Sequence, residues 1–179
     1  MKIKCGYTLI ELIVALSLMV VVLLGGTALF TQNLRSGGMT DVDLNLNSSV
    51  RFIMDNLERS LRYGKVLSVD DKTRDDCLSL GADGYTGVNV SVEDVNGLVT
   101  EYSLTNSKIA STSALSGNVV YLNTDELIVN SLSVKWVCRS GISDKINLDI
   151  NVSSSVLGSD VTISRSVSRE ILLLNSSTN

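Results

Sequence analysis

The chain of 179 residues contains no histidine and no proline. Without an imidazole, it lacks the side chain that most often serves as acid–base catalyst and metal ligand near neutral pH. Its many serines have no histidine to activate them, and no pairing of lysine with serine stands out, so a nucleophilic serine is unsupported. The composition predicts a protein that is not an enzyme and that uses no cofactor.

Basic residues are also scarce, with 15 lysines and arginines against 19 aspartates and glutamates and a formal net charge of −4. Proteins that bind nucleic acid through a broad electrostatic surface carry the opposite balance. We therefore expect no nucleic-acid partner, although a small local site would escape a count of this kind.

One long apolar run stands near the N-terminus. Residues 7–30 contain a single charged side chain, Glu11, and as a helix they would extend roughly 36 Å, which is enough for one bilayer crossing. Lys2 and Lys4 precede the run and favour a cytoplasmic N-terminus. A secretory signal peptide fits badly, because its small-residue cleavage site would follow the apolar core. A lipoprotein signal fails as well, since Cys5 precedes the apolar segment.

Glu11 is the feature that a plain membrane anchor does not explain. A carboxylate near the centre of a membrane helix costs about 2.5–3.5 kcal/mol on insertion scales, and such groups usually have a partner. If the chain is cut after Gly6, the new α-amine of Tyr7 lies about one helical turn from Glu11. Pairing of Glu11 with the amine of a neighbouring subunit would drive lateral assembly.

The N-terminal sequence resembles the type IV prepilins and the pseudopilins of type II secretion. A short basic leader ends in Gly6, an aromatic residue follows, and Thr8-Leu9-Ile10-Glu11-Leu12 leads into the apolar helix. The resemblance implies cleavage after Gly6 by a prepilin peptidase and N-methylation of Tyr7. It also implies that Glu11 guides assembly with other pilins into a helical filament.

The same resemblance implies a cleaved leader at residues 1–6 and a single-pass anchor at residues 7–30 in the bacterial inner membrane, with the remainder periplasmic or at the cell surface. Two departures from the family pattern are visible. Tyr7 replaces the usual phenylalanine, and no proline is present in the helix, although many family members carry one. Gly25-Gly26 is the candidate for a weak point instead, since glycine costs about 1 kcal/mol in a helix.

A second helical pattern covers residues 41–63, within an expected stalk and amphipathic helix at residues 31–64. Gly37-Gly38 predicts a break or a flexible joint before it, and Gly64 predicts its end. Apolar side chains recur at three- and four-residue spacing and predict a buried stripe: Val42, Leu46, Val50, Ile53, Met54, Leu57 and Leu61.

The other face of this helix carries charges four residues apart. The expected pairs are Arg51 with Asp55, Asp55 with Arg59, and Glu58 with Arg62, as on a solvated helix surface. Residues 49–64 also show a second, weaker resemblance to the larger minor subunits of these filaments, the J-type pseudopilin and the W-type minor pilin. Many amphipathic helices share the pattern, but it favours a minor over a major subunit.

Residues 65–179 are rich in valine, serine, threonine and asparagine, which favours strands and turns. Residues 98–104 and 108–111 read as a hairpin, and the run 161–174 is either two strands or one with a break. Four alternating sets predict strands with one buried face: Val88, Val90 and Val92; Leu132, Val134, Trp136 and Cys138; Ile146, Leu148, Ile150 and Val152; Val161 and Ile163. We expect an α+β protein, a pilin-like ladle with an N-terminal transmembrane and stalk helix, whose outer half packs across an antiparallel sheet of about five to seven strands.

Two cysteines, Cys77 and Cys138, remain once Cys5 leaves with the leader. An even pair in an exported domain reads as a disulfide, and a loop of about 60 residues would contribute roughly 4 kcal/mol of stability. Two buried free thiols are the alternative, and the bond requires an oxidising compartment. The pair does not make a zinc site, which wants four clustered ligands.

The acidic stretch at residues 70–76 precedes Cys77. Some pseudopilins bind calcium through loop carboxylates, but the order of residues here does not match the alternating EF-hand pattern. A solvated turn is therefore the default, calcium binding is the alternative, and no metal site is predicted.

These features predict a minor pilin or pseudopilin, a structural subunit of a type II secretion pseudopilus or a type IV pilus. A surface-exposed minor pilin that acts as an adhesin or DNA-uptake tip module is the alternative. An exported enzyme on a signal anchor would need a catalytic constellation, and none is visible.

Overall fold

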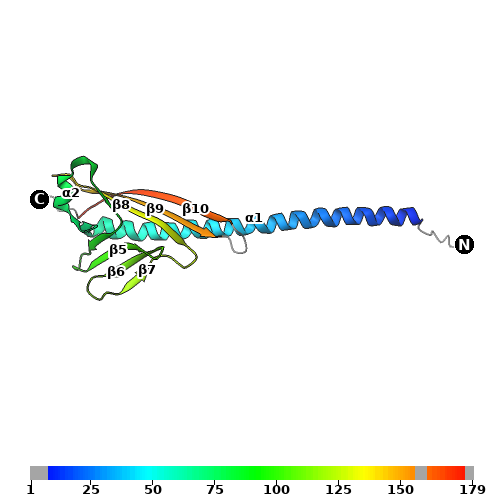
Figure 1. Ribbon diagram of the computed structural model, residues 1–179, viewed down its shortest axis with the longest axis horizontal. Coiled ribbons are helices and arrows are strands. Elements are labelled where there is room, and N and C mark those ends of the chain that lie inside the picture. Colours follow the sequence, from blue (N-terminus) through cyan, green and yellow to red (C-terminus); the bar gives the residue numbers. More distant parts are fainter. Residues whose placement is uncertain (1–7, 156–160, 176–179) are drawn as a thin grey trace. The chain divides into compact units, whose positions relative to one another are not determined.

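The computed structural model describes residues 8–155 and 161–175, and Figure 1 shows the arrangement of their elements. The described helices and strands are α1 (Leu9–Tyr63), β1 (Lys65–Val69), β2 (Lys72–Thr73), α2 (Arg74–Ser79), the 3₁₀ helix η1 (Gly81–Asp83), β3 (Tyr85–Gly87), β4 (Val90–Glu93), β5 (Val99–Thr105), β6 (Lys108–Ser113), β7 (Val119–Tyr121), β8 (Ile128–Val137), β9 (Lys145–Ser155) and β10 (Thr162–Leu172). A long N-terminal helix followed by antiparallel sheets makes this an α+β protein, as predicted.

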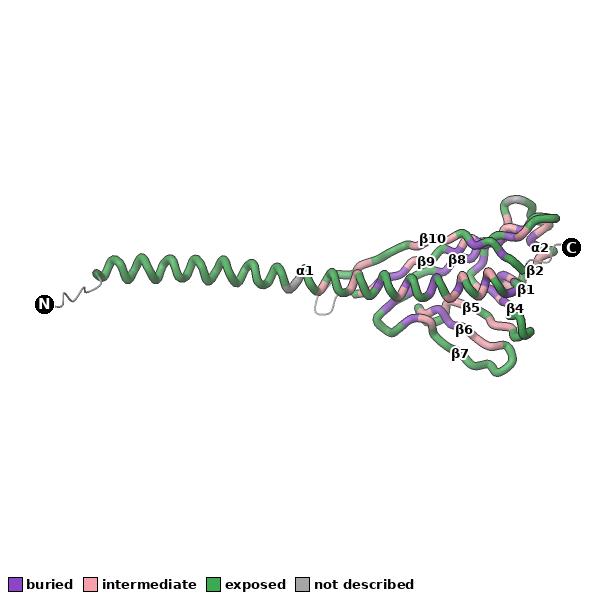
Figure 2. Tube along the Cα trace, turned by 180° about the vertical axis from the view of Figure 1, so that it is seen from behind, coloured by how far each residue is buried: buried purple, intermediate pink, exposed green. Residues whose placement is uncertain are grey.

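The chain divides into two compact units, Met1–Asp41 and Val42–Asn179. In the first unit, the large apolar side chains between Leu9 and Phe30 are 51–78% exposed, and Figure 2 shows this part of α1 as exposed. By length and composition α1 is long and apolar enough to cross a membrane. An exposed apolar helix of this length needs lipid or other helices around it.

α1 is continuous from Leu9 to Tyr63, so the break predicted at Gly37-Gly38 is wrong. Gly25-Gly26 is helical as well. Each glycine costs about 1 kcal/mol in a helix. A helix that is already formed on both sides of a glycine pair nevertheless continues through it, because each added residue gains a hydrogen bond and no new nucleation step is needed. The Thr40 hydroxyl donates to the Ser36 carbonyl oxygen at 2.9 Å and spans the pair.

The end of α1 lies at Gly64, as predicted. The Gly64 amide donates to the Ser60 carbonyl oxygen at 2.8 Å. A Cβ atom on Gly64 would collide with the Val92 side chain of β4 and with the Ser60 carbonyl oxygen. Glycine therefore ends the helix here and also lets β4 approach it closely.

The strands form two antiparallel sheets, and the expectation of a single sheet is wrong. The six-stranded sheet has the order β2-β1-β4-β5-β6-β7, and the four-stranded sheet has the order β10-β9-β8-β3. Alternation of apolar and polar residues indicates that a strand has one buried face, but it does not indicate which strands are its neighbours. β3 pairs with β8, far along the chain, through the register Tyr85↔Trp136 to Gly87↔Val134.

The core of the second unit forms between α1 and both sheets. Every residue of the predicted stripe from Leu46 to Leu61 is buried, and so are the alternating sets on β8 and β9. Two single residues were placed wrongly, since Val88 is 50% exposed and Val161 39% exposed. The predicted hairpin is confirmed as β5 and β6.

β10 is one unbroken strand, so the predicted division or break in the run 161–174 is wrong. Its two arginines bind α1. The Arg165 guanidinium donates to the Asp43 carboxylate at 2.7 Å. Arg169 donates to Asp55 at 2.8 Å and to Glu58 at 2.5 Å, and the hydrogen bond to Asp55 raises the pKa of Arg169 against the opposing effect of burial.

Because Asp55 pairs with Arg169 of β10, the ion pairs on the surface of α1 differ from those predicted. The pair of Glu58 with Arg62 is confirmed. The pairs of Asp55 with Arg51 and with Arg59 are wrong among the described residues, because Asp55 pairs with Arg169. The charged face of α1 is therefore partly a contact surface for β10.

The predicted disulfide between Cys77 and Cys138 is present, with 5.8 Å between the two Cα atoms and a sequence separation of 61. It ties α2 to the end of β8. Arg74, also in α2, donates through Nε to the Asp144 carboxylate at 2.7 Å, and the Asp144 side chain is 1% exposed. A covalent bond and a nearly buried ion pair thus hold the same two segments together.

Replacing Arg169 by alanine should lower the free energy of unfolding by about 1 kcal/mol, because two partly exposed ion pairs are lost at once. The matched control is Lys145→Ala, which removes the more exposed pair with Glu170 and should change stability by less than about 0.5 kcal/mol. Urea unfolding of the full chain in detergent, followed by fluorescence of Trp136, measures both. Equal effects of the two substitutions would contradict the proposed role of Arg169.

Replacing Cys77 and Cys138 together by alanine should lower the free energy of unfolding by roughly 4 kcal/mol, because the unfolded chain loses its cross-link. The control Cys5→Ala leaves both partners in place and should have no such effect. The same urea titration measures the difference. A double variant as stable as the oxidised protein would show that the bond does not constrain this domain.

Candidate functional site

The first turn of α1 is closed by a reciprocal pair of hydrogen bonds between Thr8 and Glu11. The Thr8 amide and hydroxyl donate to Oε2 of Glu11 at 3.2 and 3.3 Å, and the Glu11 amide donates to the Thr8 hydroxyl oxygen at 3.3 Å. This is a capping box, which satisfies free amides at the start of a helix. A carboxylate at this end also interacts favourably with the helix dipole.

The capping box was open to prediction, because threonine followed three residues later by glutamate before an apolar run is its sequence signature. Of the three predicted processing and assembly residues, the structure places Glu11. Gly6 and Tyr7 lie outside the described residues.

The acidic stretch at residues 70–76 divides between two local structures. Asp70 lies in the turn between β1 and β2 with φ of 44°, and its carboxylate accepts hydrogen bonds from the amides of Val88 and Asn89. Asp76 forms a capping box with Thr73 at the start of α2, and the hydrogen bond from the Thr73 amide lowers the pKa of Asp76.

Within residues 8–155 and 161–175, no three Asp, Glu or Cys side chains are grouped so that they could hold a metal ion. The carboxylates of Asp70 and Asp76 instead accept hydrogen bonds from nearby backbone amides. In the described structure this stretch forms a turn at Asp70 and a helix cap at Asp76.

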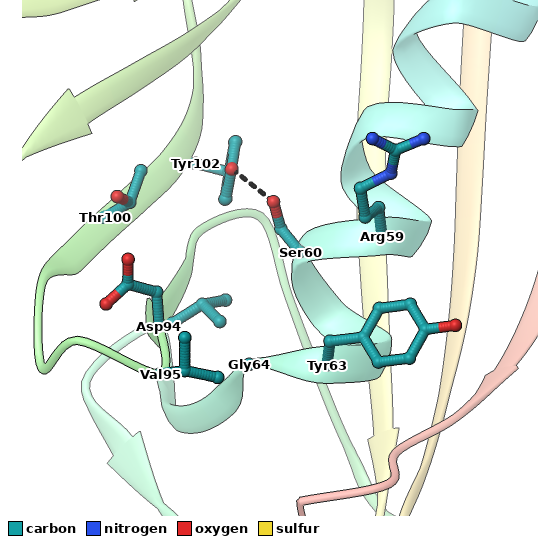
Figure 3. Close-up of a pocket in the computed structure, with 9 residues that line it drawn as sticks. Arg59, Ser60, Tyr63, Gly64, Asp94, Val95, Thr100 and Tyr102 are labelled. Atoms are coloured by element: carbon teal, nitrogen blue, oxygen red, sulfur yellow. Dashed lines mark hydrogen bonds between the residues drawn. The ribbon is translucent and has the colours of Figure 1, made fainter.

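A pocket of about 180 Å³ lies where the C-terminal end of α1 meets β4 and β5. Figure 3 shows Ser60 of α1 directed toward Tyr102 of β5, with 2.7 Å between their hydroxyl oxygens. Val92 and Val95 add apolar surface. Arg59 and Asp94 also line the pocket, so it presents charged as well as apolar groups.

Asp94 lies at the rim of this pocket. Its carboxylate accepts hydrogen bonds from the amides of Asn96 and Leu98 at 2.8 and 2.9 Å, which fixes the turn between β4 and β5. The hydrogen bond from Leu98 lowers the pKa of the Asp94 carboxyl. An ionised Asp94 is thus a structural acceptor for two turn amides.

The comparisons with known proteins concern the N-terminal segment. Residues 1–27 match a family model described as the prokaryotic N-terminal methylation motif. No curated protein and no solved structure matches the chain. The motif, with the long apolar helix and the antiparallel sheets that follow it, supports a prepilin-type pilin or pseudopilin family for this chain.

This family is structural, and its motif implies processing by a prepilin peptidase and assembly with other pilins. The apolar part of α1 fits a membrane-anchored pilin. Besides the capping box of Thr8 and Glu11, sequence reasoning missed two contacts in the second unit: the arginines of β10 on α1, and the bond between Ser60 and Tyr102. Each joins residues far apart in the chain, and no local pattern marks such pairs.

The lowered pKa of Asp94 predicts an acid-sensitive turn. The pKa of Asp94 in the folded state lies below the ordinary 3.8. The ionised carboxylate therefore stabilises the turn at pH values above 3.8, and this stabilisation is lost as the pH falls through the lowered pKa. Amide chemical shifts of Asn96 and Leu98 should follow this titration, and Asp94→Asn should remove it. A titration midpoint at or above 3.8 would contradict the assignment.

Proposed function

We propose that this chain is a minor pilin or pseudopilin that is cleaved after Gly6, N-methylated at Tyr7 and extracted from the inner membrane into a filament. The observation that carries the proposal is the methylation motif at residues 1–27, together with the exposure of the large apolar side chains from Leu9 to Phe30 within the described chain. A bundle of such helices would replace the lipid around each of them.

Glu11 would set the register of this bundle. Both bonds from Thr8 end on Oε2, which leaves Oε1 without a hydrogen bond among the described residues. The α-amine of a neighbouring mature subunit would supply a charge-assisted bond to that oxygen. The capping box supports the proposal because it holds the carboxylate ready at the first turn before a neighbour arrives.

The finer assignment to a minor subunit of the J or W type rests on the resemblance of residues 49–64. The second unit supports a structural role through the large apolar core that it buries. Its disulfide and its ion pairs are suited to a domain that must stay folded outside the cytoplasm.

The charge of Glu11 and its capping function are separable by substitution. Glu11→Gln keeps a side chain that can close the capping box but removes the charge, so we expect normal cleavage and a loss of incorporation into filaments. Glu11→Ala and Glu11→Val should behave alike. The matched control is Thr8→Ala, which weakens the cap by about 1 kcal/mol and should leave incorporation near normal.

Immunoblots of sheared filaments and membranes from cells measure cleavage and incorporation together. Normal incorporation of Glu11→Gln would refute the proposed pairing. Equal defects in Glu11→Gln and Thr8→Ala would assign Glu11 to helix capping instead.

A further inference from the structure

The turn between β4 and β5 contains Asn96-Gly97, the only place in the sequence where glycine follows asparagine. Such a pair is chemically reactive in a flexible chain, because a residue without a side chain lets its backbone approach neighbouring groups closely. The Gly97 nitrogen forms a bond to Cγ of Asn96, the bond from Cγ to Nδ2 breaks, and the proton of the Gly97 amide leaves with the departing ammonia. Water then opens the cyclic imide to aspartate or isoaspartate.

In the folded chain, both groups that take part in this reaction already hold hydrogen bonds to Asp94. The Gly97 amide donates to the Asp94 carbonyl oxygen at 3.1 Å. Nδ2 of Asn96 donates to Oδ2 of Asp94 at 3.3 Å. The attack requires a free Gly97 nitrogen and an Asn96 side chain turned toward it, so both bonds must break first.

The backbone around the reactive pair is fixed by the same residue. Oδ1 of Asp94 accepts from the amides of Asn96 and Leu98 at 2.8 and 2.9 Å, and the Asp94 amide donates to the Leu98 carbonyl oxygen at 2.9 Å. Asn96 and Gly97 are themselves exposed to solvent. Hydrogen bonding rather than burial therefore restrains this pair.

Negative charge near Gly97 acts in the same direction. The attacking nitrogen must lose its proton, and nearby carboxylates disfavour a second negative charge. Oε1 of Glu93 lies 3.8 Å from the position that a Cβ atom on Gly97 would take. The Asp94 carboxyl, whose pKa is lowered mainly by the hydrogen bond from Leu98, adds a second negative charge to the turn.

We propose that Asn96 is a deamidation site which Asp94 protects in the folded chain. Loss of this protection would alter the turn in two ways. A carboxylate at position 96 could no longer donate to Asp94, and isoaspartate would add a methylene group to the backbone of a tight turn. Asp94 thus acts as a positioning residue that determines how long the turn between β4 and β5 stays chemically intact.

Mass spectrometry of the full, oxidised chain in detergent micelles tests the proposal. Samples are kept in mildly alkaline buffer with and without urea and then digested, and the peptide that contains Asn96 is followed for the mass shift from amide to acid. Fluorescence of Trp136, the only tryptophan, reports whether the domain is folded. The folded chain should react at least about tenfold more slowly than the unfolded chain, since tenfold corresponds to about 1.4 kcal/mol and two hydrogen bonds must break.

Two substitutions of Asp94 separate its contributions. Asp94→Ala removes the acceptor for the Asn96 side chain and for both turn amides, so the folded variant should lose most of the protection. Asp94→Asn keeps one oxygen for the turn amides but loses the charge and the acceptor for Nδ2 of Asn96, so its rate should be intermediate. The matched control Asp125→Ala removes an exposed carboxylate that pairs with Lys108 and should leave the rate unchanged.

Equal rates at Asn96 in the folded and unfolded chains would overturn the proposal, and so would an unchanged rate in both Asp94 variants. If Asp94→Ala unfolds the domain, Asp94→Asn decides alone: faster deamidation of the folded variant supports the protection, and an unchanged rate refutes it. None of these readouts depends on Glu11 or on filament assembly, so the proposed function is tested separately.

Discussion

The second unit depends on the burial of one apolar stripe. From Leu46 to Leu61, α1 presents side chains that are almost completely removed from water, and each sheet contributes one apolar face to the same core. Burial of a large aliphatic side chain contributes about 1.5–3 kcal/mol, far more than a surface ion pair. The arginines of β10 act at the periphery of this core, whereas the disulfide of α2 is buried within it.

The same helix meets a different requirement before residue 41. There the apolar side chains surround the helix on all sides and are exposed within the described chain, so one polypeptide cannot satisfy them. Lipid satisfies them in a membrane, and neighbouring helices would satisfy them in a filament. The same requirement applies to Glu11, because a carboxylate in apolar surroundings is stabilised only when a partner bonds to it. In the isolated chain, Thr8 donates hydrogen bonds to only one oxygen of this carboxylate, Oε2.

Local patterns were sufficient for local structure. The period of the stripe, the alternation on β8 and β9, and the motif before the apolar run all follow from residues close in sequence. The turn of the β5–β6 hairpin also follows local rules, since Asn106 and Ser107 both adopt the positive φ of a tight hairpin turn. The second sheet and the pairing of Asp55 with Arg169 could not be predicted from local patterns, because both join residues that are far apart in the sequence. The continuity of α1 through Gly37-Gly38 shows that a local glycine cost is outweighed when long helical segments flank it.

The central claim is that the apolar helix begins at a processed N-terminus and is used for assembly. The most direct test is mass spectrometry of the N-terminal peptide from chains recovered in the filament fraction, with the membrane fraction analysed beside it. The account predicts that chains in filaments begin at N-methylated Tyr7 and that Met1 to Gly6 is absent from them. Filament chains that retain the leader, or a processed chain that never leaves the membrane fraction, would contradict it.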